Sequence, residues 1–138
     1  MSALEDPIQE RAGGSAAEWG PRDAIWGFTQ AIGGGDLETA TSCFSPEGCF
    51  ITPDSTVVRG REAIRPLLAQ LIEMRVQVEF ELARLTVSGA LAWGFGRWRM
   101  RSPGVAEAGF ERSSAATVTL GIGAGSWLLQ TLAPWEGR

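Results

Sequence analysis

The apolar pattern of the chain starts at residue 21 and has helical spacing in its first half. Ile25, Phe28 and Ile32 follow one another at steps of three and four. Pro21 is a residue type favoured at the first position of a helix, and three glycines at 33–35 end the pattern. We therefore predict a first helix over this stretch.

Two more helices are predicted before residue 75. Asp36 is a typical N-cap for a short helix, DLETATSCF, which the Ser-Pro pair at 45–46 ends. In residues 61–74, REAIRPLLAQLIEM, the apolar residues match the i, i+3, i+4, i+7, i+8 template, although Pro66 implies a start only shortly before it. Turn formers flanked by β-branched and aromatic residues predict a hairpin over residues 48–60.

The pattern changes to the period of a strand at Val76, where apolar and polar residues begin to alternate. The glycines of GIGAGS, residues 121–126, lack the third glycine of a dinucleotide-binding motif and lie between strands, which favours a hairpin turn. Helices followed by a meander predict an α+β fold, with three N-terminal helices packed on a strongly curved, mostly antiparallel sheet. The four long strands are expected from residue 76 to the turn at 88–89, then over 90–101, 106–122 and 127–135.

The composition limits the function classes. The 138 residues suffice for one domain, expected over residues 20–138, while the polar residues 1–19 are expected to form a flexible arm. The chain has no His and no Tyr, and all 12 basic residues are Arg, which excludes imidazole and lysine chemistry and leaves Asp or Glu as proton carriers. The net charge of −4 argues against nucleic-acid partners.

Cysteine content and hydropathy restrict the chain further. Cys43 and Cys49 are too few for a zinc site and are expected to be reduced core residues, with no metal or other cofactor implied. No stretch is apolar enough for a membrane helix and no targeting segment is recognised, so we expect a cytoplasmic protein without membrane association.

The strand over residues 90–101 suggests two interpretations. Arg97 and the arginines two and four positions after it share a face of the strand with Trp93 and Phe95, because alternate residues of a strand point to the same side. In one interpretation these arginines point to water while Trp98 and Met100 pack in a dimer contact. In the other, Trp93 and Phe95 line a cavity in which Arg97 binds a carboxylate, enolate or phenolate oxygen.

Two acidic positions are candidates for chemistry. Asp54 falls in the predicted turn after Pro53, where aspartate is common for local hydrogen-bonding reasons, and a catalytic role is the alternative. Glu111 and Arg112 point to opposite faces of their strand, so one of them must look inward or toward a partner.

The phrases GGGDLETATSCFSPEGCFITPDSTVVRGREAI, VSGALAWGFGRWRMR and GAGSWLL resemble, in their order, the nuclear transport factor 2-like superfamily, in particular its SnoaL-like and ketosteroid-isomerase-like branch. The resemblance spans roughly residues 20–135. It implies a cone-shaped α+β barrel with an apolar pocket suited to polycyclic or terpenoid molecules, commonly in a homodimer formed through the outer sheet face.

The functional residues of this branch are not all retained. Thr52 stands where ketosteroid isomerases carry the general-base Asp, Phe28 stands at their oxyanion-binding Tyr, and Thr117 lies near their second acid. The dehydratase type of the superfamily needs His and Tyr, and its epoxide-hydrolase type uses an Asp-Arg-Asp cluster that the arginine-rich strand lacks.

The resemblance therefore favours a SnoaL-like cyclase or isomerase for a hydrophobic, polyketide- or terpenoid-like substrate. In this hypothesis Asp54 or Glu111 transfers the proton and Arg97 stabilises the oxyanion. The alternatives are a non-catalytic ligand-binding or homodimeric interaction module, and an epoxide hydrolase or lyase of the same fold. The residues expected to line the ligand pocket are Trp26, Phe28, Phe50, Thr52, Trp93, Phe95, Thr117 and Gln130.

Overall fold

The computed structural model describes residues 20–52, 54–102, 110–123 and 125–134. The predicted arm over residues 1–19, the turn residues 103–104 and the first four residues of the strand expected from 106 lie outside this part. The described elements are α1 (Pro21–Gly34), α2 (Leu37–Ser42), β1 (Phe44–Ile51), β2 (Val57–Arg59), α3 (Arg61–Glu73), β3 (Gln77–Ser88), β4 (Leu91–Ser102), β5 (Phe110–Gly123) and β6 (Ser126–Ala133).

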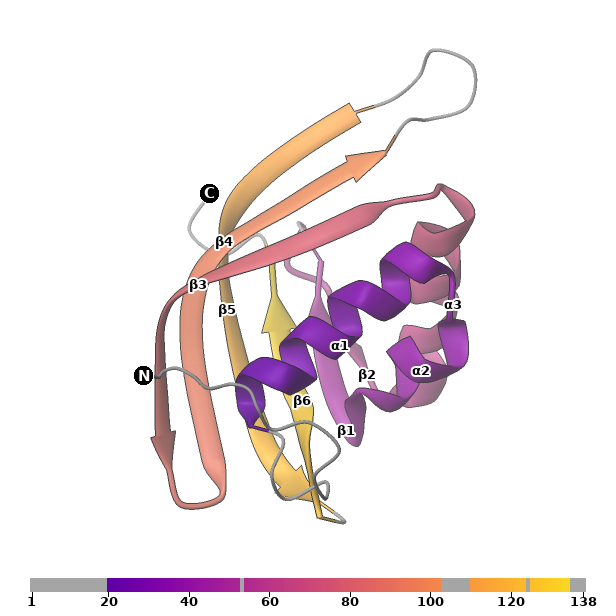
Figure 1. The fold of residues 1–138 in the computed structure, drawn as a ribbon. Coiled ribbons are helices and arrows are strands. Elements are labelled where there is room, and N and C mark those ends of the chain that lie inside the picture. The colour runs from indigo at the N-terminus through magenta and orange to yellow at the C-terminus, as the bar shows by residue number, and fades with distance from the viewer. Residues whose placement is uncertain (1–19, 53, 103–109, 124, 135–138) are drawn as a thin grey trace.

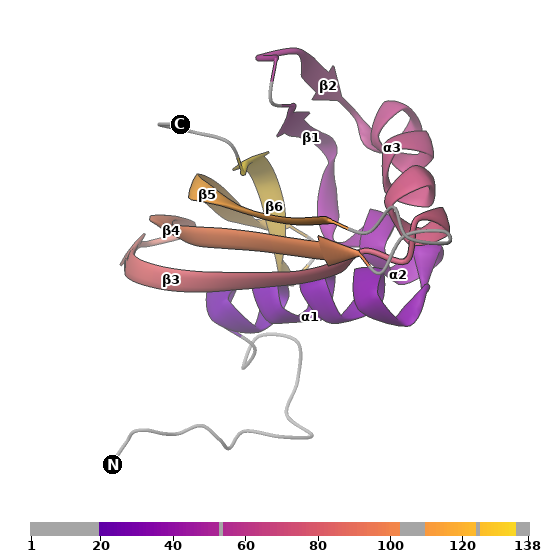
Figure 2. The ribbon, with the colours of Figure 1, turned by 90° about the horizontal axis from the view of Figure 1, so that it is seen from above.

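The strands form one sheet in the order β2-β1-β6-β5-β4-β3. Strands β1 and β6 run parallel, and every other neighbouring pair is antiparallel. The helices lie on one side of the sheet, and the long strands β3, β4 and β5 bend around that side (Figures 1 and 2). The predicted α+β architecture, with three N-terminal helices on a curved and mostly antiparallel sheet, is confirmed.

Local hydrogen bonds explain where α1 begins and where the chain turns into α2. The Asp23 carboxylate accepts a hydrogen bond from the Gly20 N–H at 2.7 Å, which satisfies a free donor at the helix N-terminus. Gly35 takes a φ of 78°, a conformation that favours glycine, and ends α1. Asp36 then caps α2 by accepting from the Thr39 N–H at 3.2 Å.

Two predicted element boundaries are wrong. Strand β1 starts at Phe44, so Ser45 and Pro46 belong to the strand and not to a loop. An irregularity in the β1–β6 pairing between Phe44 and Cys49 accommodates the proline, which could not donate to a regular ladder. Helix α3 begins at Arg61, five residues before the exposed Pro66 and thus earlier than the proline implied.

The inner face of the sheet is set by β4, where Ala92, Trp98 and Met100 are buried against the helices. Trp93 and Phe95 are about half exposed on the opposite, outer face. Both interpretations of this strand were wrong in part, because its arginines point outward while Trp98 and Met100 belong to the core and not to a dimer contact.

Glycines explain this register. A Cβ on Gly96 would lie 2.1 Å from the carbonyl oxygen of Glu81, and one on Gly94 would lie 2.5 Å from that of Arg84. Strand β3 therefore coils closely over β4 at its bulge between Leu82 and Arg84. At positions 94 and 96 of the inner face only glycine fits, so the residues that alternate with these glycines, Trp93 and Phe95, face outward.

The core lies between the inner sheet face and the helices. The ring of Phe28 in α1 meets Phe44 edge-on, with ring centroids 5.4 Å apart. Ile64 and Leu68 of α3 are fully buried. In the described part of the chain, the helices are too short or too polar to cross a membrane.

Candidate functional site

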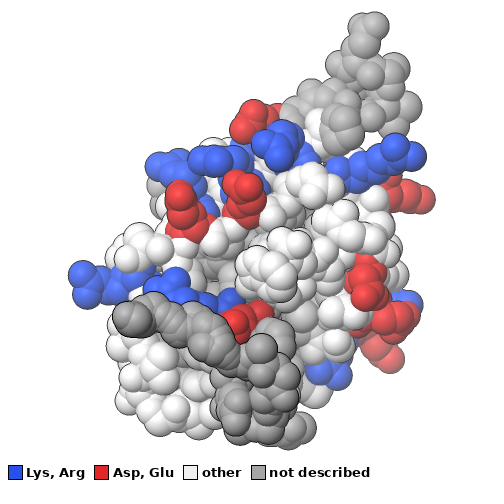
Figure 3. Space-filling model, viewed as in Figure 1, with Lys and Arg blue, Asp and Glu red and all other residues white. Residues whose placement is uncertain are grey.

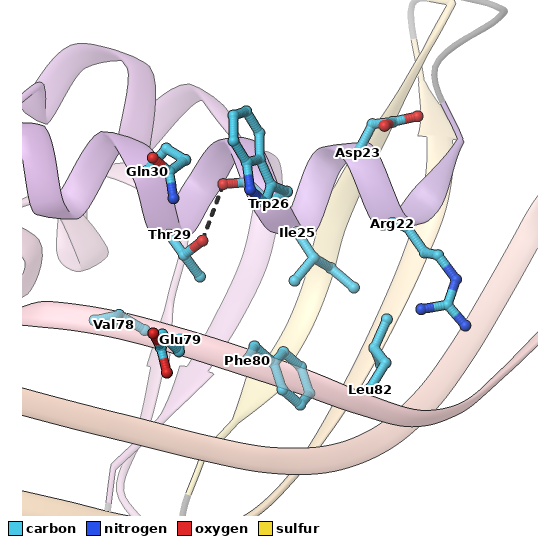
Figure 4. A pocket seen from close by; sticks show the side chains of 10 residues that line it. All are labelled: Arg22, Asp23, Ile25, Trp26, Thr29, Gln30, Val78, Glu79, Phe80 and Leu82. Carbon is cyan, nitrogen blue, oxygen red and sulfur yellow. Dashed lines mark hydrogen bonds between the residues drawn. The ribbon is translucent and has the colours of Figure 1, made fainter. Parts of the chain in front are cut away.

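A cleft of about 600 Å³ runs between α1 and the edge strand β3 (Figure 4). This volume is within the range of small-molecule sites, which is roughly 300–1,000 Å³. The lining residues are Arg22, Asp23, Ile25, Trp26, Thr29 and Gln30 from α1, and Val78, Glu79, Phe80 and Leu82 from β3.

The floor of the cleft is mainly apolar. Ile25 and Thr29 point from α1 toward β3 (Figure 4), and the Thr29 hydroxyl donates to the Trp26 carbonyl at 3.0 Å. Val78, Phe80 and Leu82 alternate along β3 and therefore share the face turned to the helix. Because Ile25 and Val78 also belong to the hydrophobic core, the floor is a continuation of that core.

The rim of the cleft is polar except for one aromatic side chain. Arg22, Gln30 and Glu79 are exposed, and so is Trp26, whose exposed fraction is 61%. A tryptophan at the rim of an apolar hollow offers a flat, mainly apolar surface, and a ligand that covers this surface removes it from water. The cleft thus combines an apolar floor with a rim that is mostly polar and carries one exposed aromatic side chain.

Two of the charged side chains at the rim already bind other groups of the protein. Asp23 caps α1 through the Gly20 N–H, and Glu79 forms an ion pair with Arg99 at 3.3 Å on the outer sheet face. Both side chains of that pair are exposed, so its contribution to stability is small. Arg22 makes no ion pair with another residue of the described part of the chain.

Asp54 belongs to the turn between β1 and β2 and not to the cleft. Its carboxylate accepts hydrogen bonds from the Thr52 hydroxyl and from the Thr56 N–H, the latter at 3.2 Å. The Thr52 hydrogen bond is the main reason that the pKa of Asp54 lies below its usual value. A proton carrier working near neutral pH needs a raised pKa, so this environment favours the structural interpretation of Asp54.

Phe28 and Phe50 are fully buried in the core. Both pack near the Phe44 ring, at centroid distances of 5.4 and 6.3 Å from it. They act as packing residues, because an aromatic side chain between a helix and a sheet fills space that no ligand can then share.

The remaining predicted site residues lie on the outer face of the sheet. Arg97 donates to the Ser113 hydroxyl at 2.9 Å, and Glu111 lies directly opposite Arg101. Thr117 pairs with the outward-facing Phe95, and the Gln130 side chain covers Gly121. The structure therefore does not bring Asp54, Arg97 and Glu111 together, and only Trp26 among the predicted pocket residues lines the cleft.

Arg112 is the inward member of the Glu111–Arg112 pair. It lies directly opposite Met100, whose side chain is buried on the inner face. Residues directly opposite in an antiparallel pair share a face, so the two-residue alternation assigns Glu111 to the outer face.

Sequence reasoning missed the strand side of the cleft. The alternation that begins at Val76 puts Glu79 and Phe80 on opposite faces of one strand but assigns neither of them to a site. A usable signal existed, because a long strand that directly follows the last helix and starts a meander can be a sheet edge. Its partner, the exposed face of α1 that carries Trp26, could have been read from the helical spacing.

The thiols and acidic groups show no metal site. In the described segments, no cluster of three or more His, Cys, Asp or Glu side chains is placed to hold a metal ion. Cys43 and Cys49 are free thiols, half-buried and buried. Burial raises the pKa of Cys43 to about 11, so this thiol is a packing group and not an activated nucleophile.

Comparison with known proteins identifies relatives at the level of the family and the fold. The sequence profile of the SnoaL-like domain matches residues 26–123. No curated protein sequence matches the chain.

Solved structures share the fold at low identity. An NTF2-like protein with a cystatin-like fold from Novosphingobium aromaticivorans is 20% identical, with a TM-score of 0.69 over 85% of this chain and 80% of that one. A ketosteroid isomerase-like protein from Erwinia carotovora atroseptica is 14% identical, with a TM-score of 0.69 over 81% and 89%. An NTF2-like protein of unknown function from Shewanella oneidensis is 14% identical, with a TM-score of 0.66 over 81% and 93%.

Proposed function

Because the chain belongs to the SnoaL-like domain family, within the NTF2-like fold, we propose that it binds a flat hydrophobic small molecule in the cleft between α1 and β3. The observation that carries the proposal is the exposed Trp26 at the rim of a cleft with an apolar floor. Arg22 at the same rim favours ligands that also carry an acidic or electron-rich group.

The proposal is tested by a thermal-shift screen against aromatic polyketides, steroids and terpene epoxides. A ligand at one hundred times its dissociation constant stabilises the folded protein by about 2.7 kcal/mol. For the compound class that raises Tm, Trp26→Ala should weaken binding about tenfold, since an aromatic contact is lost. Val57→Ala, which truncates an exposed apolar side chain on β2 at the other sheet edge, should leave binding unchanged.

Two results would reject the cleft as the ligand site. One is the absence of a Tm shift with all three compound classes. The other is binding that responds equally to Trp26→Ala and Val57→Ala, because that outcome places the ligand elsewhere.

A carboxylate at the cleft supports a second candidate function, acid/base catalysis of a cyclisation or isomerisation. Glu79 lines the cleft beside Phe80, whereas Asp54 and Glu111 lie outside it. In this version the Glu79 carboxylate, which is paired with Arg99 in the absence of ligand, removes a proton from a substrate bound in the cleft and later returns it.

The neighbouring Glu81 offers a matched control, because it occupies the same strand but does not line the cleft. Glu79→Gln should abolish turnover of a confirmed ligand with little effect on its affinity, and Glu81→Gln should change neither. Equal turnover in both variants would reject Glu79 as the proton carrier, and no turnover by the wild-type protein would leave it a binding module.

The outer sheet face supports the further proposal of a homodimer. Leu91, Trp93 and Phe95 follow one another on this face of β4, each about half exposed. Glu79, Glu81, Arg97 and Arg99 line a groove beside them, and charged side chains of both signs gather over β3 and β4 (Figure 3). An apolar patch next to balanced charges can face a rotated copy of itself.

Analytical ultracentrifugation tests this proposal. Trp93→Asp places a charge in the apolar patch and should convert a dimer into a monomer, while Val57→Asp, an equal change on β2, should not. A wild-type protein that sediments as a monomer at all concentrations would refute the homodimer.

A further inference from the structure

One polar atom in the core lacks a partner. Among the buried side-chain nitrogen and oxygen atoms of the described residues, Trp98 Nε1 alone has no hydrogen bond. The Trp98 side chain is 2% exposed, on the inner face of β4. The hydroxyl directly opposite it on β5, that of Ser114, donates to the carbonyl of Pro134. Buried donors nearly always have an acceptor, because an unmade hydrogen bond destabilises the fold.

The indole lies one side chain behind the wall of the cleft. Phe80 is directly opposite Trp98 on β3, and the two rings meet edge to face with centroids 5.9 Å apart. Phe80 itself lines the cleft. A displacement of the Phe80 ring would therefore open a route from the cleft to Trp98.

Phe80 has room to move toward the cleft. It also borders a groove of about 300 Å³ that Glu81 and Arg97 line. A fully buried phenylalanine could turn only by displacing close-packed neighbours. Phe80 is half-buried and lines the cleft, so its ring is not enclosed on every side by close-packed neighbours.

We propose that Phe80 is a movable wall of the cleft and that Trp98 Nε1–H donates a hydrogen bond to an oxygen of the bound ligand. This inference rests on the proposed ligand-binding function and narrows the ligand class. We infer a neutral acceptor, because Trp98 belongs to the hydrophobic core, where an anion would lose its hydration. The ligand is thus a flat, largely apolar molecule with a carbonyl oxygen, such as a polycyclic ketone or quinone.

Two probes of equal shape test the inference. 2-Acetylnaphthalene carries a ketone oxygen, and 2-isopropylnaphthalene carries a methyl group in its place. The wild-type protein should bind the ketone about tenfold more tightly than the hydrocarbon, the increment expected of one hydrogen bond. Trp98→Phe, which keeps an aromatic ring and removes the N–H, should abolish this preference. Trp127→Phe, the same change at a tryptophan outside the cleft, should retain it.

The indole proton gives a readout that does not depend on a variant. The chain has six tryptophans, so the ¹H–¹⁵N spectrum holds six resolvable indole signals. The ketone should move the Trp98 signal downfield, as expected for a new hydrogen bond, and the hydrocarbon should not. This measurement keeps the test decisive if Trp98→Phe fails to fold.

The wall itself is tested by hydrogen exchange of the same proton. Phe80→Ala should speed exchange of the Trp98 indole proton at least tenfold, without a matching change at Trp127. An unchanged rate would refute Phe80 as the wall.

The failures of the two proposals are distinguishable. If neither probe binds, the cleft proposal falls and this inference falls with it. If both probes bind with equal affinity, or if the ketone preference survives in Trp98→Phe, the cleft remains a binding site and the role of Trp98 is refuted.

Discussion

The close approach of β3 to β4 at Gly96 leads to a strong prediction about stability. In Gly96→Ala the new methyl carbon would lie 2.1 Å from the Glu81 carbonyl oxygen and 2.8 Å from the Leu82 Cα, whereas ordinary contacts start at 3.4 Å. Both contacts are with backbone atoms, which cannot move aside as a flexible side chain can. The strands must therefore separate locally by more than 1 Å.

The cost follows from this separation. Overpacking costs about 1–3 kcal/mol, and the weakening of one or two ladder hydrogen bonds adds about 1 kcal/mol each. We expect Gly96→Ala to lower the free energy of unfolding by about 3 kcal/mol, which corresponds to a Tm lower by about 10 °C.

Gly27→Ala is the matched control, because it makes the same chemical change in α1. No atom lies within 4 Å of the position of its Cβ, and alanine is the better helix former. This variant should be about 0.5–1 kcal/mol more stable than wild type. Urea unfolding of both variants measures the difference, and a Gly96→Ala protein within about 0.5 kcal/mol of wild type would refute the register described for β3 and β4.

Two further predictions concern ionisable groups outside the cleft. The folded-state pKa of Asp54 is lowered, so its hydrogen bonds with Thr52 and Thr56 stabilise the protein above the unfolded pKa of about 3.9 and are lost as pH falls through the folded pKa. Asp54→Ala should therefore lower Tm at pH 7 and match wild type at the acid end of a pH series, and a Tm difference that is independent of pH would contradict this. The pKa of Cys43, near 11, makes its thiolate about a hundredfold scarcer at pH 8 than that of a free thiol, so iodoacetamide should label it only after unfolding. Rapid labelling of Cys43 in the folded protein, read by mass spectrometry of its peptide, would count against its burial.

Two elements show which parts of the fold can be predicted from the local sequence pattern. The helical spacing of Ile25, Phe28 and Ile32 is enough to predict α1, because an amphipathic helix must bury that face. The turn formers around Asp54 likewise predict the hairpin of β1 and β2, since their hydrogen bonds are made within five residues. Such features depend only on near neighbours in the chain.

The candidate site depended on contacts that are distant in sequence. Its two walls, α1 and β3, are separated by more than 40 residues and meet only because β3 forms the sheet edge beside the helix. Local alternation could not reveal which face of β4 turns inward, since a shift of one residue exchanges the faces. The close approach at Gly94 and Gly96 decided it and moved Trp93, Phe95 and Arg97 away from the interior.

The sequence by itself determined the fold class, the order of most elements and the absence of histidine and lysine chemistry, because propensity, periodicity and composition are local properties. The tertiary structure alone decided that Trp26 and Phe80 line a common cleft, that Trp98 is buried without a partner for its N–H, and that the arginines of β4 lie on the outer face. These contacts arise from the pairing and coiling of strands. Strand pairing joins residues that are far apart in the chain, and no periodicity in the sequence marks which residues will pair.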